Sequence, residues 1–112
     1  MSYEVVEVFK EKLINVIEAY WERNPPKSPG AGMYYNHLMS YIESNDTISI
    51  VKLIEFLICA GYTERDVIKI FYHAGIITTS DDFVKYRDGI RRVLINSDCK
   101  DTVRVLRSER EI

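Results

Sequence analysis

The feature that most constrains this chain is a nearly uninterrupted apolar segment at residues 48–58, inside a longer stretch that reads DTISIVKLIEFLICAGYTERDVIKIFYH. In a helix, its apolar side chains cover almost the full circumference, so other elements must surround it. These side chains are Ile48, Ile50, Val51, Leu53, Ile54, Phe56, Leu57 and Ile58. The segment therefore predicts the central helix of a bundle.

The two ends of this central helix carry capping and turn signals. Asp46 or Thr47 can cap its start through a side-chain oxygen, and Gly61 suits the left-handed residue that ends it. Thr63 and Asp66 then form a start that resembles a capping box, in which each residue satisfies a free backbone N–H of the other. We therefore expect a second helix directly after a glycine-containing turn.

Elsewhere, apolar side chains recur at three- and four-residue spacing, which predicts further helices. We expect these at residues 2–23, 33–43 and 83–95, with Ser2 and Ser80 as caps. Prolines and glycines predict a loop at residues 24–32. The side chains expected to face inward from the last helix are Phe83, Tyr86, Ile90, Val93 and Leu94.

The length of the chain, 112 residues, predicts a single domain, residues 1–112. The expected fold class is all-α, a compact bundle of about five helices. Residues 96–112 mix apolar and charged side chains. The sequence is compatible with three structures for this tail: a short strand, a last helical turn or a docking segment.

The overall charge and the cysteines exclude several classes of protein. A formal net charge of -2 argues against nonspecific coating of duplex DNA, although a local basic face is compatible with it. Cys59 and Cys99 make no metal-binding pattern and are too few for a disulfide framework, and Cys59 is expected to be a small buried hydrophobe. We predict no metal and no cofactor.

No signal peptide is recognised before the first expected helix, and the longest apolar run falls well short of the roughly 20 residues of a membrane span. The chain is therefore expected to be cytoplasmic, with no membrane partner. It also carries no catalytic signature, because its acidic residues have ordinary helix-surface spacing and neither histidine lies in a motif. We predict that the chain by itself is not an enzyme.

The strongest polar feature is a set of basic residues on the last expected helix. Arg87 and Arg91 are four residues apart and share one edge, whereas Lys85 and Arg92 are seven apart and share another. One interpretation is a nucleic-acid or nucleotide surface, on which the cations contact phosphates and Tyr86 stacks on a base. The other interpretation is a solvated helix face, partly neutralised by neighbouring acidic residues.

A helix-turn-helix interpretation of residues 47–74 is also open. Its second helix would present Arg65, Lys69 and His73 to a DNA groove. Acidic Glu64 and Asp66 at the leading end of that helix would face phosphates unfavourably. We therefore rank this interpretation below the one that follows.

Three segments together resemble a known family. They are Pro25-Pro26 before a short helix, KLIEFLICAGYTERDVIKIFYHAGI at residues 52–76, and TTSDDFVKYRDGI at residues 78–90. The resemblance covers roughly residues 25–95. It is to the helical C-terminal domain of the noncatalytic large subunit of DNA primases, to the cluster-free X-type subunit of archaeal primase, and to the helix-bundle domain of plasmid primases.

The resemblance implies a noncatalytic accessory subunit that binds single-stranded template DNA, the initiating nucleotide, or both, beside a primase catalytic subunit. Tyr86 and Arg87 fall where the family places a tyrosine that approaches nucleotide or template. The chain lacks the four cysteines of the iron–sulfur cluster, so the resemblance is to the cluster-free forms. Ile50 replaces a basic residue of the family, and Lys52 is the nearest cation.

Two alternatives to the primase role belong to other classes. One is a small helical protein-interaction module, such as a virus or a plasmid encodes, that modulates a partner protein. Its marker would be an exposed apolar patch on the first helix or the tail. The other is the helix-turn-helix regulator described above.

Overall fold

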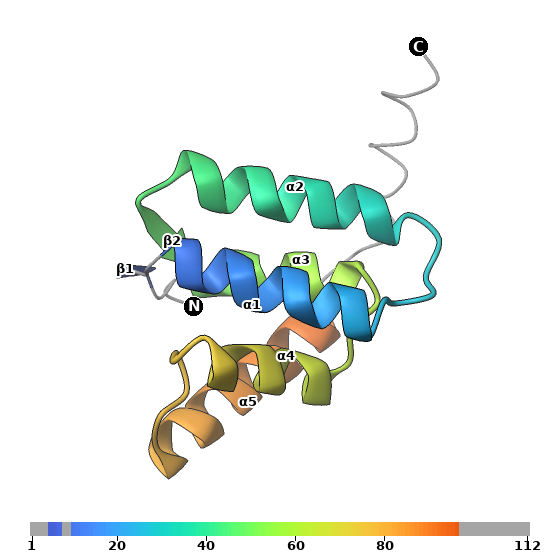
Figure 1. The fold of residues 1–112 in the computed structure, drawn as a ribbon. Helices are drawn as coiled ribbons and strands as arrows, with labels where there is room; N and C mark the ends of the chain where they lie inside the picture. Colours follow the sequence, from blue (N-terminus) through green and yellow to red (C-terminus); the bar gives the residue numbers. More distant parts are fainter. Residues whose placement is uncertain (1–4, 8–9, 97–112) are drawn as a thin grey trace.

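The structure is a computed structural model, and it describes residues 5–7 and 10–96. In this part of the chain the elements are β1 (Val5–Glu7), α1 (Lys10–Arg23), α2 (Ala31–Ser44), β2 (Thr47–Ser49), α3 (Ile50–Cys59), α4 (Glu64–His73) and α5 (Ser80–Asn96). In the view of Figure 1, α1 runs between α2 and α4 and crosses in front of α3. The predicted all-α bundle of about five helices is confirmed.

The central position of α3 follows from its apolar surface. This helix packs against α2, α4 and α5. Ile50, Leu53, Ile54 and Leu57 are at most 3% exposed and belong to the main hydrophobic core. The remaining circumference is less enclosed than predicted, because Lys52 and Glu55 are exposed and Val51, Phe56 and Ile58 are only half-buried.

A short two-stranded sheet replaces part of two predicted helices. β1 pairs with β2 in an antiparallel register that places Val6 opposite Ile48. Both strands contain β-branched residues, which favour extended pairing over helix. The prediction of a helix that spans residues 2–23 is therefore wrong over β1, and α1 begins at Lys10. The predicted cap Ser2 lies outside the described residues.

The start of α3 also differs from the prediction, because β2 occupies the residues expected to cap it. Ser49 is the N-cap instead of Asp46 or Thr47, and its Oγ accepts a hydrogen bond of 3.4 Å from the Lys52 N–H. A serine oxygen at this position satisfies one of the unpaired N–H groups of the first turn.

The turn between α3 and α4 has the predicted chemistry. Gly61 adopts a left-handed φ of 108°, which a side chain would disfavour. A Cβ at this position would also lie 2.3 Å from the Oγ of Ser28, in the loop between α1 and α2. Thr63 and Asp66 form a capping box at the start of α4, as predicted.

The two remaining helices start earlier than predicted. α2 begins at Ala31, and α5 already includes Ser80 in its helical residues. Thr79 provides the first-turn contact that was expected of Ser80, because its Oγ1 accepts a 3.1 Å hydrogen bond from the Asp82 N–H. Of the side chains expected to face inward from α5, Tyr86, Ile90 and Val93 are buried, whereas Phe83 and Leu94 are exposed.

Cys59 at the end of α3 differs from the expectation of a buried hydrophobe. It is half-buried and disulfide-bonded. The other cysteine of the sequence, Cys99, lies outside the described residues, as does the proposed docking tail beyond Asn96.

The burial of α3 predicts a large effect of truncating Leu57, which is 1% exposed. Leu57→Ala is expected to lower the free energy of unfolding by about 2–5 kcal/mol, because it removes buried apolar surface and leaves a cavity. Urea titration followed by circular dichroism measures this change.

Glu55→Ala is the matched control, because Glu55 lies in the same helix and is exposed. Its effect should stay within about 0.5 kcal/mol. Equal unfolding midpoints for the two variants would contradict the central role of α3.

Candidate nucleic-acid interface

The five residues predicted on α5 do not form one patch. α5 buries Tyr86, Ile90 and Val93 against the rest of the bundle. Because successive helical residues are about 100° apart, Arg87 and Arg91 lie to one side of this buried stripe and Lys85 and Arg92 lie to the other. The structure thus keeps the two predicted basic edges apart.

The edge that carries Arg87 and Arg91 is engaged in contacts within the protein. The Arg91 Nε donates a 2.6 Å hydrogen bond to Oε1 of Glu64, which joins α5 to the start of α4. The Arg87 guanidinium lies 3.7 Å from the Asp88 carboxylate and stacks over the Phe83 ring at 5.6 Å. These contacts reduce the positive charge that this edge offers to a ligand.

Tyr86 cannot provide the exposed stacking plane that was predicted for it. Its side chain is 7% exposed, and its ring packs edge-on against Phe71 of α4 at 5.8 Å. The Lys85 ammonium lies 5.4 Å from the centre of the same ring. Since a base must reach the face of an aromatic ring to stack on it, the stacking role of Tyr86 is corrected to a core role.

The side chain of Lys52 contacts α2. It lies on α3, and its ammonium is 5.9 Å from the ring centre of Tyr41 on α2. The Tyr41 hydroxyl accepts a 2.8 Å hydrogen bond from the Ser49 N–H. The structure therefore associates Lys52 with α2 and with the start of α3.

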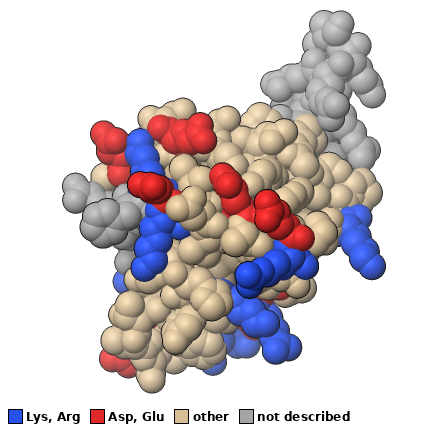
Figure 2. All heavy atoms as spheres, viewed as in Figure 1, with Lys and Arg blue, Asp and Glu red and all other residues tan. Residues whose placement is uncertain are grey.

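A second group of exposed side chains lies on α4. We define the outer face of α4 by Arg65, Lys69, Tyr72 and His73. All four side chains are exposed. Figure 2 shows Lys and Arg side chains over α4 and the C-terminal end of α1, whereas the Asp and Glu side chains higher in the view are interspersed at the left with further Lys and Arg. The α5 prediction missed this face, and it missed Tyr72 altogether.

Glu64 and Asp66, which weighed against α4 as a DNA-binding helix, point away from its outer face. Glu64 contacts Arg91 on the α5 side. Asp66 faces α1, where it accepts a hydrogen bond from the Tyr20 hydroxyl. It also accepts hydrogen bonds from the Thr63 N–H and Oγ1 at 3.0 and 2.9 Å. Both carboxylates thus have partners inside the protein, which sequence spacing alone did not reveal.

These hydrogen bonds set the protonation of the Tyr20–Asp66 pair. Burial of the Asp66 carboxyl raises its pKa, but the hydrogen bonds from Tyr20 and Thr63 outweigh burial and leave the pKa of Asp66 below its ordinary value. Burial, reinforced by the bond to Asp66, raises the pKa of Tyr20. The proton therefore stays on Tyr20 and the negative charge on Asp66.

An aromatic cluster supports this contact between α1 and α4. Tyr62, in the turn before α4, packs edge-on against Tyr20 at 5.4 Å and against Trp21 at 6.4 Å. Trp21 in turn contacts Tyr35 of α2 at 4.3 Å. The Tyr62 hydroxyl is buried without a hydrogen-bond partner among the described residues, and burial raises its pKa to about 12. The cluster fixes the position of the first turn of α4.

In the described part of the chain, no three histidine, cysteine, aspartate or glutamate side chains gather as a possible metal site. No helix there combines the length and apolar character needed to cross a membrane. Comparisons of the chain with family models, curated proteins and solved structures find no match.

The lowered pKa of Asp66 predicts a pH-dependent contribution to stability. An unfolded aspartate has a pKa of about 3.9, so the Asp66 carboxylate stabilises the fold above that pH and loses its effect as the pH falls through the lower folded pKa. Asp66→Asn should therefore be less stable than the wild type at pH 7. The difference between the two should shrink below about pH 4, which urea titrations across this range measure.

Asp46→Asn serves as the control, because the Asp46 side chain is fully exposed and pairs only with Lys10, at 3.2 Å, among the described residues. An exposed pair of this kind contributes little. A stability difference between Asp66→Asn and the wild type that is the same at every pH would contradict the assignment.

Proposed function

We propose that this protein is a noncatalytic accessory module that binds single-stranded nucleic acid. The observation that carries the proposal is the contrast between cations and acids on α4. Arg65 and Lys69 are exposed and form no ion pair with any described residue, whereas Glu64 and Asp66 are held by partners on α5 and α1. Such a surface attracts phosphate groups, because binding releases the counterions that surround them.

The specific form of the proposal is a primase accessory subunit, which the family resemblance suggests. In this role the module holds template DNA while a separate catalytic subunit performs phosphoryl transfer with carboxylate-bound metal ions. Burial of Tyr86 and the position of Lys52 beside Tyr41 of α2 weigh against an initiating-nucleotide site built from that set. The proposal therefore gives priority to the template strand.

A second candidate function is protein interaction, and the exposed apolar residues of α5 favour it. Exposed fractions reach 44% for Val84, 47% for Leu94 and 81% for Ile95. Leu94 and Ile95 are neighbours at the end of the helix, and exposed apolar side chains that lie together are typical of surfaces that partner proteins cover. The predicted marker was an apolar patch on the first helix or the tail, whereas these residues lie on α5, and the tail beyond Asn96 lies outside the described residues.

A cytoplasmic location is part of the proposal, and the disulfide at Cys59 is the feature that bears on it. Disulfides are rare in reducing compartments, with intracellular proteins of hyperthermophiles as an exception. The disulfide therefore weighs against the cytoplasmic location, which rests on the sequence alone.

The proposed function predicts salt-dependent binding of a short labelled oligothymidylate, measured by fluorescence anisotropy at several salt concentrations. The logarithm of the affinity should fall against the logarithm of salt concentration with a slope of roughly 0.7 per phosphate contact. An oligothymidylate with an uncharged methylphosphonate backbone is the matched control, and it should bind weakly and without this salt dependence.

A pull-down from the native host tests the partner. Recovery of a primase catalytic subunit supports the specific role. Recovery of another protein, combined with no binding of oligothymidylate at low salt, would refute the proposal and favour the protein-interaction module.

A further inference from the structure

The orientation of α4 about its own axis is fixed from both sides. On one side, Asp66 binds the Tyr20 hydroxyl of α1, and on the other side, Glu64 binds Arg91 of α5. Val67, Ile70 and Phe71 are fully buried between these contacts. In this orientation, the outer face of α4 is exposed to solvent.

Along this face, the exposed side chains form a row. Arg65 and Lys69 are one helical turn apart, and Tyr72 and His73 follow within the next turn. From Arg65 to Tyr72 the row covers about 10 Å of helix axis, at 1.5 Å per residue. Tyr72 is 63% exposed, and its ring meets His73 edge-on at 5.6 Å. Two cations are thus followed by an accessible aromatic ring.

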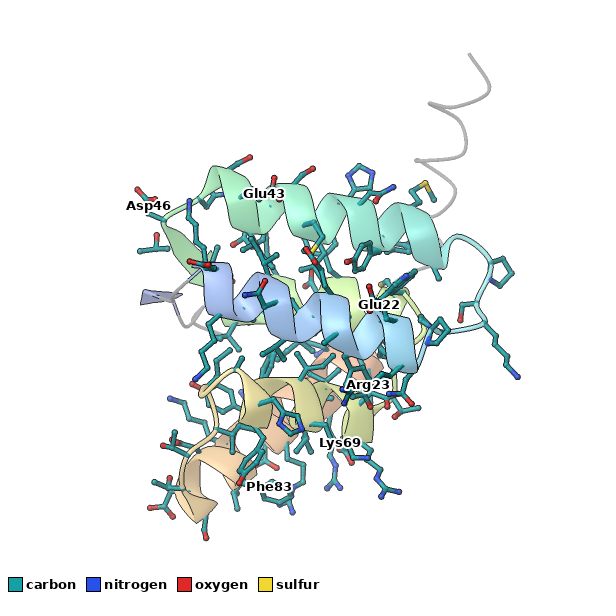
Figure 3. The ribbon with its side chains drawn as sticks, viewed as in Figure 1. Glu22, Arg23, Glu43, Asp46, Lys69 and Phe83 are labelled. Atoms are coloured by element: carbon teal, nitrogen blue, oxygen red, sulfur yellow. The ribbon has the colours of Figure 1, made fainter. Side chains whose placement is uncertain are left out.

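The surroundings of the row add positive charge at one end. Figure 3 shows Arg23, at the end of α1, on the same side of the molecule as Lys69. In the same view, Glu22 lies higher, toward α2. The cations Arg23, Arg65 and Lys69 therefore attract a polyanion toward the part of the surface where α1 ends and α4 runs.

We infer that the outer face of α4 is the binding surface for single-stranded DNA, an inference that rests on the proposed function. Arg65 and Lys69 contact consecutive parts of the phosphate backbone, and Tyr72 stacks on a base. Cations that follow the backbone, combined with an exposed ring, are the usual elements of sequence-tolerant single-strand binding. This site replaces the α5 residues as the contact surface.

The flanks of α4 favour a single strand over a duplex. A recognition helix must enter a major groove about 12 Å wide, which requires the helix to project from the protein. Here α1 and α5 pack along both sides of α4 through the contacts of Asp66 and Glu64. A flexible strand can follow the exposed outer face, whereas α1 and α5 keep the helix from projecting into the groove of a rigid duplex.

Two pairs of substitutions locate the surface with the same labelled oligothymidylate. The α4 double variant, Arg65→Ala with Lys69→Ala, should bind more weakly and lose about 1.4 from the salt slope, since two contacts at roughly 0.7 each are removed. The α5 double variant, Lys85→Ala with Arg92→Ala, removes the same charge and should bind like the wild type. Urea midpoints of both variants check that folding is unchanged.

Stacking is tested separately at Tyr72. Tyr72→Ala should weaken binding by roughly 5- to 140-fold, which corresponds to about 1–3 kcal/mol, without changing the salt slope. Tyr72→Phe keeps the ring and should bind like the wild type.

Three other outcomes would contradict the site, the preference for a single strand, or the proposed function. If the wild type binds but the α5 double variant alone is impaired, the α4 site is wrong and the proposed function stands. Tighter binding to a duplex of the same length, with the same dependence on Arg65 and Lys69, overturns the single-strand assignment in favour of the helix-turn-helix interpretation. If the wild type binds no oligonucleotide, the proposed function fails as well.

Discussion

The burial of α3 is the constraint on which the rest of the structure depends. Leu53, Ile54 and Leu57 are almost completely enclosed, and burying apolar surface of this kind is the dominant favourable term in folding. Because α3 contacts α2, α4 and α5, its burial also fixes where those helices lie. Because the turn through Gly61 is short, α4 must begin close to the end of α3. The Thr63 capping box defines the first turn of α4.

Polar contacts complete what apolar packing leaves undetermined. Hydrophobic burial orients α4 only to the extent that its apolar stripe must face inward, since the hydrophobic effect has no direction of its own. Hydrogen bonds have geometric requirements, and the bonds of Glu64 to Arg91 and of Asp66 to Tyr20 join α4 to its two neighbours. The same bonds hold the carboxylates of Glu64 and Asp66 on the flanks of α4, beside the face that Arg65 and Lys69 occupy.

The parts of the fold that depend on local sequence could be predicted, and the parts that depend on distant pairing could not. The apolar α3, Gly61 and the Thr63–Asp66 box are visible in neighbouring residues. The pairing of Val6 with Ile48 joins residues far apart in the chain, so helical periodicity concealed it. The candidate site shows the same division. Residue types and spacing revealed the cations, but the partners of Glu64 and Asp66 come from other helices.

The two tyrosines considered for stacking show why position on a helix decides function here. Tyr86 shares the buried stripe of α5 with Ile90 and Val93, whereas Tyr72 follows Phe71 and lies outside the buried stripe of α4. Both tyrosines lie close to cations in the sequence, so composition does not separate them. The net charge of -2 is equally uninformative, because it sums the charges of the whole chain and does not show that Arg65 and Lys69 lie exposed on one face of α4. A phosphate responds to the charges within about 10 Å of it at ordinary salt, so the local surface of α4, and not the whole chain, sets its attraction for a nucleic acid.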